Sequence, residues 1–395
     1  MLIFEPPISN IVSLVDNGTD DPIFVEKLCE MLFLVYADNG MFEEAIGVFD
    51  YMEKSGFKIH QKCCKVLLLA LKRCGKMDMC YSFFRRMVGA DVEITVHSMT
   101  IVIDGLCKSG KVERAKDLME EMVTKGIEPN VVSYTTLING FFIKGMVDEA
   151  LKVKTIMEQK RIEPNVVTYS TIAGGLCKLK RNKGNLKEAE RLFEEMEKRG
   201  VRPNIVTYNA LIDGYFKKGN FEEATQLFEE MDKMGVRPDI VTYNTLIDGH
   251  GKKGNLKEAK RLFEDMEKRG VTPDTVTYNT LIDGYGKIGK MTEAHNLRGV
   301  MEVMGHIPDV YTYSSLIHGE LSSGESAEAL KLLSEMKQRG LILNFVIYRA
   351  IISGLSKQGK ADEALRLYNE MLEAGITPDY RLQSAMSGSL ATVKS

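Results

Sequence analysis

Several features are missing from this 395-residue sequence, and each absence excludes a class of protein. No apolar run approaches the roughly 18 residues that a membrane helix needs, so no association with a membrane is expected. The seven cysteines contain no CxxC pair, which argues against a zinc ribbon and against a thioredoxin-type redox site. We therefore expect reduced thiols that are buried as small hydrophobic groups.

Signatures of catalysis are missing as well. The six histidines are scattered, and none pairs with another histidine or a cysteine at a spacing that suits a metal ion. Two GxGxxG strings, at 249–254 and 284–289, follow predicted helices rather than strands, which is the wrong context for binding a dinucleotide. No Ser-His-Asp set or pair of catalytic carboxylates emerges. The sequence therefore predicts neither an enzyme nor a cofactor or metal.

A strong excess of one charge is also absent, because 52 basic residues nearly balance 55 acidic ones and the net charge is −3. A bulk attraction to nucleic acid is thus not evident, and any anion-binding surface must come from local segregation of charge. The first 25 residues contain four acids and no lysine or arginine, unlike a secretory signal or an organelle transit peptide. No transit peptide is therefore expected in this chain.

What the chain does contain is an internal repeat. VTYNTLIDG stands at 241–249 and again at 276–284, and VTYNALIDG stands at 206–214. The register extends to ten repeats, nine of 35 residues, while the fifth has four extra residues near Leu179–Lys183. Repeats 1 to 10 span 26–60, 61–95, 96–130, 131–165, 166–204, 205–239, 240–274, 275–309, 310–344 and 345–379. Such a period is typical of a solenoid protein.

Each repeat predicts two antiparallel helices. In repeat 7, positions 4, 7, 8 and 11 form the apolar stripe of a first helix, which Asp239 caps and Gly254 ends. Positions 17, 20, 23, 24 and 27 form the stripe of a second helix, which Asn255 starts. Position 20 is alanine in nine repeats and Cys80 in the other, and position 27 is methionine in all ten. The small residue lets the two helices approach closely, and the methionine fills the space between them.

Stacking is required because one hairpin cannot bury both of its apolar stripes alone. The predicted fold is therefore all-α, a right-handed α-solenoid superhelix of about ten 35-residue helix-turn-helix repeats with the first helices on the concave side. We expect an atypical N-terminal segment at 1–25, two degenerate capping repeats at 26–95, eight regular repeats at 96–379 and a polar tail at 380–395. The insertion in 166–204 is expected at the turn between helices.

The sequence resembles the pentatricopeptide repeat family. Its repeat reads V-V-T-Y-N-T-L-I-D-G, then K-x-G-x-x-x-E-A, then M-x-x-x-G-x-x-P-D, closely in repeats 3 to 10 and loosely in repeats 1 and 2. The related tetratricopeptide repeat has 34 residues and a tryptophan signature, whereas this chain has no tryptophan and a step of 35. It is similar to the P-class, of the restorer-of-fertility-like type, which is built of 35-residue repeats. The resemblance implies a plant protein of the mitochondrion or chloroplast.

The resemblance also implies that positions 5 and 35 of a repeat together read one base of single-stranded RNA. Position 5 is polar, lies off the core stripe and shares a face with positions 2, 9 and 12. Two short polar side chains that face one base edge can supply the donors and acceptors for a choice of base. The implied base-reading pairs are Thr100/Asn130, Thr135/Asn165, Ser170/Asn204, Asn209/Asp239, Asn244/Asp274, Asn279/Asp309 and Ser314/Asn344.

An alternative for position 35 is a helix N-cap, which both asparagine and aspartate make well. Against a cap alone, the two positions vary together: asparagine at position 5 goes with aspartate at position 35, and threonine or serine goes with asparagine. A cap has no evident reason to follow a residue that lies a whole repeat earlier. We therefore favour the reading role, although recent duplication of repeats 6 to 8 accounts for part of the correlation.

Position 2 carries an apolar side chain that could sandwich a base between neighbouring repeats. Such stacking contributes on the order of 1–3 kcal/mol per base. The alternative is a valine half buried between repeats. The candidate stacking residues are Val132, Val167, Val206, Val241, Val276, Tyr311 and Val346.

Phosphate contacts require local cations, and lysine recurs at position 13, at the end of the first helix. The candidates are Lys108, Lys178, Lys217, Lys252, Lys287 and Lys357. Asp213, Asp248 and Asp283 at position 9 would repel phosphate, so the groove is expected to meet bases there. The alternative is an ordinary lysine that stabilises a helix C-terminus.

Under the code that the family implies, Thr-Asn and Ser-Asn favour adenine, and Asn-Asp favours uracil over cytosine. Repeats 3 to 9 would then bind near 5′-AAAUUUA-3′, while repeats 1, 2 and 10 depart from the code. Seven letters do not specify one transcript, so protein cofactors or loose contacts from repeats 1, 2 and 10 are expected to contribute. Such a protein would act in organelle mRNA processing, stability or translation. The alternative is a helical-repeat scaffold that binds a protein segment in its concave groove, a role that does not need paired positions 5 and 35.

Overall fold

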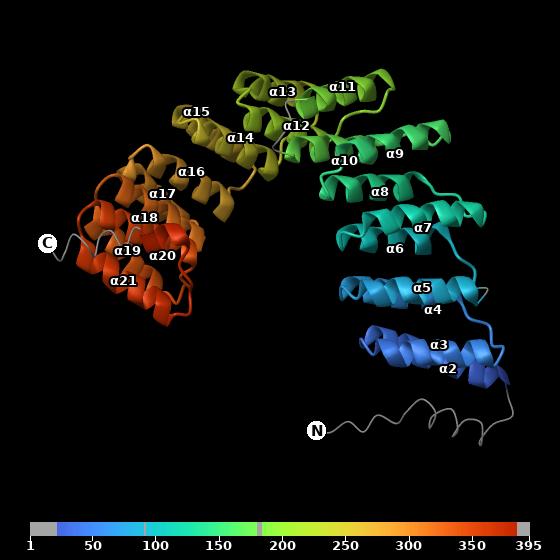
Figure 1. Ribbon diagram of the computed structural model, residues 1–395. Coiled ribbons are helices and arrows are strands. Elements are labelled where there is room, and N and C mark those ends of the chain that lie inside the picture. Colours follow the sequence, from blue (N-terminus) through green and yellow to red (C-terminus); the bar gives the residue numbers. More distant parts are fainter. Residues whose placement is uncertain (1–21, 91, 180–183, 385–395) are drawn as a thin grey trace. The chain divides into compact units, whose positions relative to one another are not determined.

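The computed structural model describes residues 22–90, 92–179 and 184–384, and within those ranges every regular element is an α-helix (Figure 1). The first helices of repeats 1 to 10 are α2 (Pro22–Asp38), α4 (Gln61–Arg73), α6 (Val96–Lys108), α8 (Val131–Ile143), α10 (Val166–Lys178), α12 (Ile205–Lys218), α14 (Ile240–Lys252), α16 (Thr275–Lys287), α18 (Val310–Ser322) and α20 (Phe345–Lys357). The second helices are α3 (Phe42–Lys54), α5 (Met77–Gly89), α7 (Val112–Thr124), α9 (Val147–Gln159), α11 (Gly184–Lys198), α13 (Phe221–Lys233), α15 (Leu256–Lys268), α17 (Met291–Val303), α19 (Ser326–Gln338) and α21 (Ala361–Glu373).

The turn between the two helices of a repeat depends on the glycine at position 15. Gly254 adopts a φ of +79°, which a residue with a side chain would reach only under strain. Its N–H donates to Gly251 O at 2.9 Å, and the next N–H, of Asn255, donates to His250 O at 2.9 Å. These two bonds satisfy carbonyl groups that the end of α14 leaves open, so α15 can begin directly. The predicted insertion falls mainly on residues 180–183, which lie outside the described residues, as do 1–21 and 385–395.

The core follows the periodicity of the repeat. Every side chain at positions 20 and 27 is at most 2% exposed, from Ala45 and Met52 in repeat 1 to Ala364 and Met371 in repeat 10. In repeat 7, Tyr243 of the first helix is fully buried as well. The predicted place of the small residue and of the methionine in the core is therefore confirmed.

The chain divides into two compact parts, residues 1–203 and 204–395, and each is described by itself. In both parts each second helix packs on the first helix of its own repeat, and consecutive first helices pack on one another, as α6 does on α8 and α16 does on α18. Most second helices also contact the first helix of the next repeat. The first helices thus form a continuous layer within each part, and the predicted all-α repeat solenoid is confirmed.

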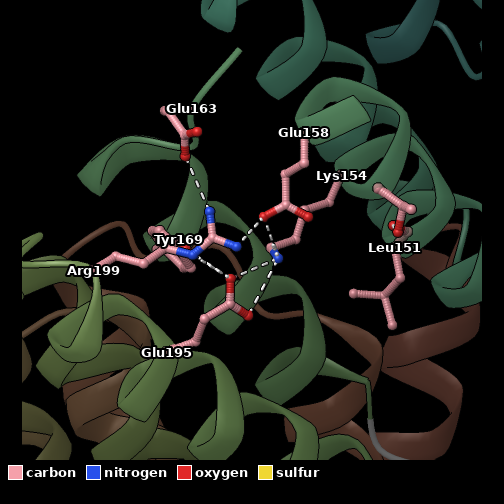
Figure 2. Close-up of polar contacts among 8 residues, drawn as sticks. Leu151, Lys154, Glu158, Glu163, Tyr169, Glu195 and Arg199 are labelled. Carbon is pink, nitrogen blue, oxygen red and sulfur yellow. Dashed lines mark hydrogen bonds and ion pairs between the residues drawn. The ribbon is translucent and has the colours of Figure 1, made fainter. Parts of the chain in front are cut away.

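Ion pairs join the second helices of neighbouring repeats. Figure 2 shows Lys154 of α9, which is 8% exposed, donating to Glu195 Oε1 of α11 at 2.9 Å. Tyr169 at position 4 donates its hydroxyl to the same carboxylate at 2.9 Å, and Arg199 bonds Glu158 at 2.8 Å. Burial alone would raise the pKa of Glu195, but the bonds from Lys154 and Tyr169 outweigh it and hold that pKa below its ordinary value. These charged groups therefore connect the second helices of repeats 4 and 5, α9 and α11.

Candidate nucleic-acid interface

All seven candidate residues at position 35 of repeats 3 to 9 cap the first helix that follows them. Asn130 Oδ1 accepts the N–H groups of Val132 and Ser133 at 3.0 and 3.1 Å, and Asp239 Oδ1 accepts the N–H of Thr242 at 2.9 Å. The cap uses one side-chain oxygen. The second polar atom is the amide nitrogen of an asparagine or the other carboxylate oxygen of an aspartate, so capping leaves a polar group for another partner.

In the three Asn-Asp pairs, positions 5 and 35 contact each other directly. The amide Nδ2 atoms of Asn209, Asn244 and Asn279 donate to the capping Oδ1 of their aspartates. The distances are 3.3 Å to Asp239, 3.3 Å to Asp274 and 3.0 Å to Asp309. A cap therefore has a structural reason to follow position 5, contrary to our expectation. The covariation does not by itself require a nucleic acid.

The Thr-Asn pairs are joined differently, through a hydroxyl of the next helix. Thr100 Oγ1 lies 2.8 Å from Ser133 Oγ, which in turn donates to Asn130 Oδ1 at 3.3 Å. Thr135, Thr168 and Asn165 repeat this arrangement at 2.8 and 3.2 Å. In both pairs the asparagine oxygen faces the cap, so the NH₂ group is the side of the amide that remains available.

In the Ser-Asn pair of repeat 9, Ser314 and Asn344 each bond to a backbone group. Ser314 Oγ donates to Val310 O of its own helix at 2.6 Å, and Asn344 Oδ1 accepts the N–H of Ile347 at 3.1 Å. Ser170 Oγ donates to Val166 O at 2.7 Å. Its predicted partner Asn204 belongs to the other part of the chain, so that pair remains a prediction from the sequence.

Position 3 completes these arrangements, although we assigned it no role from the sequence. The hydroxyl of Thr242 donates to Asn209 Oδ1 at 2.7 Å, and Thr277 and Thr312 make the same bond to Asn244 and Asn279 at 2.7 and 2.6 Å. These three threonines are fully buried. The available signal was a hydroxyl residue placed directly before the recurrent tyrosine in repeats 4 to 9, which becomes Ile347 in repeat 10.

The carboxylate of Asp274 is held in its charged form. Burial alone would raise its pKa, but bonds from the backbone and hydroxyl of Thr277 and from the amide of Asn244 outweigh burial and bring the pKa below its ordinary value. All three of these donors reach Oδ1. Near neutral pH, Oδ2 is consequently a charged acceptor beside the amide of Asn244.

The side chains at position 2 lie on the solvent-exposed face of the first helices. The valines at this position are 54–58% exposed, and Tyr311 is 75% exposed. A little less than half of each valine is therefore covered, which agrees both with a base-stacking role and with the alternative of a valine half buried between repeats. In each part of the chain, exposed apolar side chains stand along the layer of first helices, two residues after a position-35 cap and three residues before position 5.

Four of the six candidate lysines at position 13 form an ion pair with an aspartate at position 9. Lys217, Lys252 and Lys287 form ion pairs with Asp213, Asp248 and Asp283, one helical turn earlier at position 9. Lys108 makes the same pair with Asp104 at 3.0 Å. The aspartates thus neutralise lysines on their own helices, while Lys178 and Lys357 have Gly174 and Ser353 at position 9.

The described ranges contain no group of three or more His, Cys, Asp or Glu side chains placed to hold a metal ion. Cys64, Cys80 and Cys107 are free and buried, and burial raises the pKa of each thiol to about 12. In the same ranges no helix combines the length and the hydrophobicity needed to cross a bilayer. The polar couples and the exposed apolar line therefore remain the main candidate site.

Comparison with known proteins agrees with this architecture. A model described as "PPR repeat family" matches residues 95–143, 129–178, 181–214, 203–249, 238–287, 273–321 and 343–381. The chain belongs to the pentatricopeptide repeat (PPR) family. Two further models, each described as "PPR repeat", match residues 160–197 and residues 31–57, 63–92 and 311–341. The second of these extends the match into repeats 1 and 2.

Individual relatives are similar over very different lengths. A pentatricopeptide repeat-containing protein of Arabidopsis thaliana is 54% identical over 39 residues, which are 10% of this chain and 6% of that protein. The crystal structure of PPR10 from maize is 23% identical with a TM-score of 0.54, and the match covers 97% of this chain and 63% of that one. PPR10 in complex with an 18-nt psaJ RNA element is 23% identical with a TM-score of 0.52, covering 99% and 66%. This chain spans less than two thirds of these relatives' lengths, and the PPR10 structures establish a shared fold.

Proposed function

We propose that this PPR protein binds single-stranded RNA along its layer of first helices, with one base facing each of repeats 3 to 9. The observation that carries the proposal is the recurrence of one couple, at positions 5 and 35, beside an exposed apolar residue at position 2. A stack of similar helix pairs repeats this set of groups at successive steps along the layer. The RNA complex of PPR10, which has the same fold, supports the choice of ligand.

The polarity of the couples favours particular bases. In the Asn-Asp repeats, a charged Oδ2 acceptor lies beside an amide donor, which matches the N3–H and a carbonyl oxygen of uracil. Cytosine has an acceptor at N3 and would face the carboxylate unfavourably. In the Thr-Asn repeats, an outward NH₂ group can donate to N1 of adenine. We therefore propose a preferred site near 5′-AAAUUUA-3′, with base contacts rather than charge supplying the selectivity.

Position 2 and position 13 have supporting roles in this proposal. The exposed side chains from Val132 to Val346 would contact base faces, and the lysines from Lys108 to Lys357 would contact phosphates. Such a protein would act by binding, without catalysis of its own, in the processing, stability or translation of organelle RNA. The proposed location in a mitochondrion or chloroplast rests on the family.

The proposal is tested with the full chain and three labelled RNAs, which are AAAUUUA, a shuffled RNA of the same composition and a C-rich RNA. We expect AAAUUUA to bind most tightly and all affinities to fall as salt rises. Equal binding of all three RNAs would reject the code assignment. If none of them binds at low salt, the remaining alternative is a scaffold for a protein segment.

A further inference from the structure

The hydroxyl at position 3 stands at the centre of each described Asn-Asp couple. Thr277 Oγ1 lies 2.7 Å from Asn244 Oδ1 and 2.9 Å from Asp274 Oδ1, and it accepts the backbone N–H of Asp274 at 3.1 Å. The same three contacts recur around Thr242 at 2.7, 3.0 and 3.2 Å and around Thr312 at 2.6, 3.1 and 3.0 Å. The hydroxyl therefore joins both members of a couple from a buried site.

These contacts determine which atoms of the couple face outward. Because a hydroxyl donates to the amide oxygen of Asn244, the amide cannot rotate by 180° without placing its NH₂ group against that donor. Because Asp274 Oδ1 already accepts the backbone N–H of Thr277 and the amide of Asn244, Oδ2 is the oxygen left for a ligand. A couple whose amide could rotate would present donor and acceptor in either order and would discriminate poorly between bases.

We propose that position 3 is a third specificity-determining position, which acts as a positioning residue for the couple formed with the preceding repeat. Thr242, Thr277 and Thr312 position the couples of repeats 6, 7 and 8, and Ser133 and Thr168 position those of repeats 3 and 4. The residue does not touch RNA. This inference rests on the proposed RNA-binding function and adds to it the group that sets the polarity of each reading couple.

One repeat lacks this group and provides an internal comparison. After the couple Ser314/Asn344, position 3 is Ile347, which is 2% exposed and offers only its backbone N–H to Asn344. The side chain of Ser314 bonds its own helix instead. We therefore expect repeat 9 to select its base less strictly than repeats 3 and 4, although its couple is of the same adenine class.

The test measures discrimination at the single letter that faces one repeat. For repeat 7 this is the fifth letter, so the full chain is titrated with AAAUUUA and with AAAUCUA. Thr277→Val, which keeps the shape and removes the hydroxyl, is expected to reduce the preference for uracil about tenfold, the effect of losing one hydrogen bond to a charged couple. Thr277→Ser is the matched control and should retain the preference. Discrimination at the fourth letter, facing repeat 6, should not change.

If Thr277→Val affects only the stability of the fold, the two affinities change in a different way. If Thr277→Val weakens binding to both RNAs equally and leaves their ratio unchanged, position 3 only supports the fold and the inference is wrong. The proposed function itself fails at an earlier step, when the unaltered chain does not distinguish AAAUUUA from a C-rich RNA. The two failures are therefore distinguishable.

A gain of selectivity provides an independent check, since loss of stability cannot produce it. Ile347→Thr is expected to place a hydroxyl beside Ser314 and Asn344, as Ser133 lies beside Thr100 and Asn130. Discrimination between adenine and the other bases at the seventh letter should then rise severalfold. An unchanged seventh-letter preference would overturn the inference for this repeat.

Discussion

At the residue scale, one side chain combines two roles that we had treated as alternatives. Asp274 caps α16 through Oδ1 and keeps Oδ2 for another partner. An N-cap contributes about 1 kcal/mol to a helix, so the same residue stabilises the fold and keeps an oxygen for the base contact that we propose. The two roles do not compete because a carboxylate or an amide carries two polar atoms.

The first prediction exchanges one couple. Asn244→Thr with Asp274→Asn converts repeat 7 to the chemistry of Thr135 and Asn165, and Thr277 already supplies the hydroxyl that Thr168 provides there. We expect the preferred fifth letter to change from uracil to adenine, with a difference of about 1–3 kcal/mol between AAAUUUA and AAAUAUA. Competition binding measures the relative affinity of the variant for these two RNAs. As the control, the preference of this variant between uracil and adenine at the sixth letter should not change, because repeat 8 is unaltered. An unchanged preference at the fifth letter would contradict the code.

The second prediction concerns His250, which is 5% exposed and packs against the ring of Phe216 with 5.3 Å between centroids. Neither of its ring nitrogens has a hydrogen-bond partner among the described residues. Burial lowers the pKa of this imidazole below its ordinary value of 6.5. The unfolded chain therefore binds a proton more readily than the folded one as pH falls below about 6.5, and the free energy of unfolding decreases.

His250→Tyr tests this assignment, because Tyr285 occupies the equivalent buried place in repeat 8. The urea midpoint of the unaltered chain should fall between pH 7 and pH 5, and the midpoint of the variant should fall less. His318→Gln, at an exposed site, is the control and should behave as the unaltered chain. Equal pH dependence in the His250→Tyr variant and the unaltered chain would show that this imidazole is not the group responsible.

At the scale of the element, the lysines at the ends of three first helices are paired with aspartates of the same helix. The Asp-Lys pairs of α12, α14 and α16 join residues one turn apart on exposed faces, where a single pair contributes about 0.3–0.5 kcal/mol. Such a weak pair can be exchanged for a phosphate at little cost. In the proposed complex with RNA, we therefore expect the aspartates at position 9 to reduce the affinity without abolishing it.

The third prediction follows from that competition. Asp213→Asn, Asp248→Asn and Asp283→Asn together should strengthen binding to every RNA and steepen the dependence on salt. Lys217→Gln, Lys252→Gln and Lys287→Gln should weaken binding to every RNA by a similar factor, and the salt slope should become shallower by about one for each lysine that no longer meets a phosphate. Lys260→Gln on the second helix α15 is the matched control. A change in base preference in either triple variant would contradict a role limited to phosphates.

At the scale of the whole molecule, the repeat is the structural module. Each helix pair buries its stripes against its own partner and its neighbours in the chain, so the stability of a solenoid is approximately a sum over repeats and their interfaces. Repeats 7 and 8 share VTYNTLIDG at the start of the first helix, and repeat 6 differs from them there at one residue. One of these repeats can therefore be removed without creating a new kind of interface.

The fourth prediction is that deletion of 240–274 leaves a folded protein with a site shortened by one uracil. Asp239 would then precede Thr275 and cap α16 as Asp274 does now. With constant C-rich flanks, the shortened chain should prefer AAAUUA over AAAUUUA, and the full chain should show the opposite order. Circular dichroism per residue should be unchanged. Deletion of 240–255, which removes α14 and leaves α15 without its partner, is the control and should reduce the helix content.

The sequence by itself was sufficient for the architecture, because a 35-residue period, a glycine at position 15 and buried small and methionine residues at positions 20 and 27 are local requirements of stacked hairpins. It also drew attention to position 5, which is polar and lies off the core stripe, and to the lysine that recurs at position 13, whereas the reading role of positions 5 and 35 came from the resemblance to the family.

Only the tertiary structure decided how those residues meet. The bond of Asn244 to Asp274, the buried hydroxyl of Thr277 between them and the pairing of Asp248 with Lys252 depend on side-chain directions. The first two depend also on the spacing of adjacent helices, because Asn244 lies on α14 whereas Asp274 caps α16 and Thr277 lies on α16. Periodicity determines which face a residue occupies, whereas hydrogen bonds between repeats depend on distances of a few ångströms that are set by the packing of one hairpin on the next.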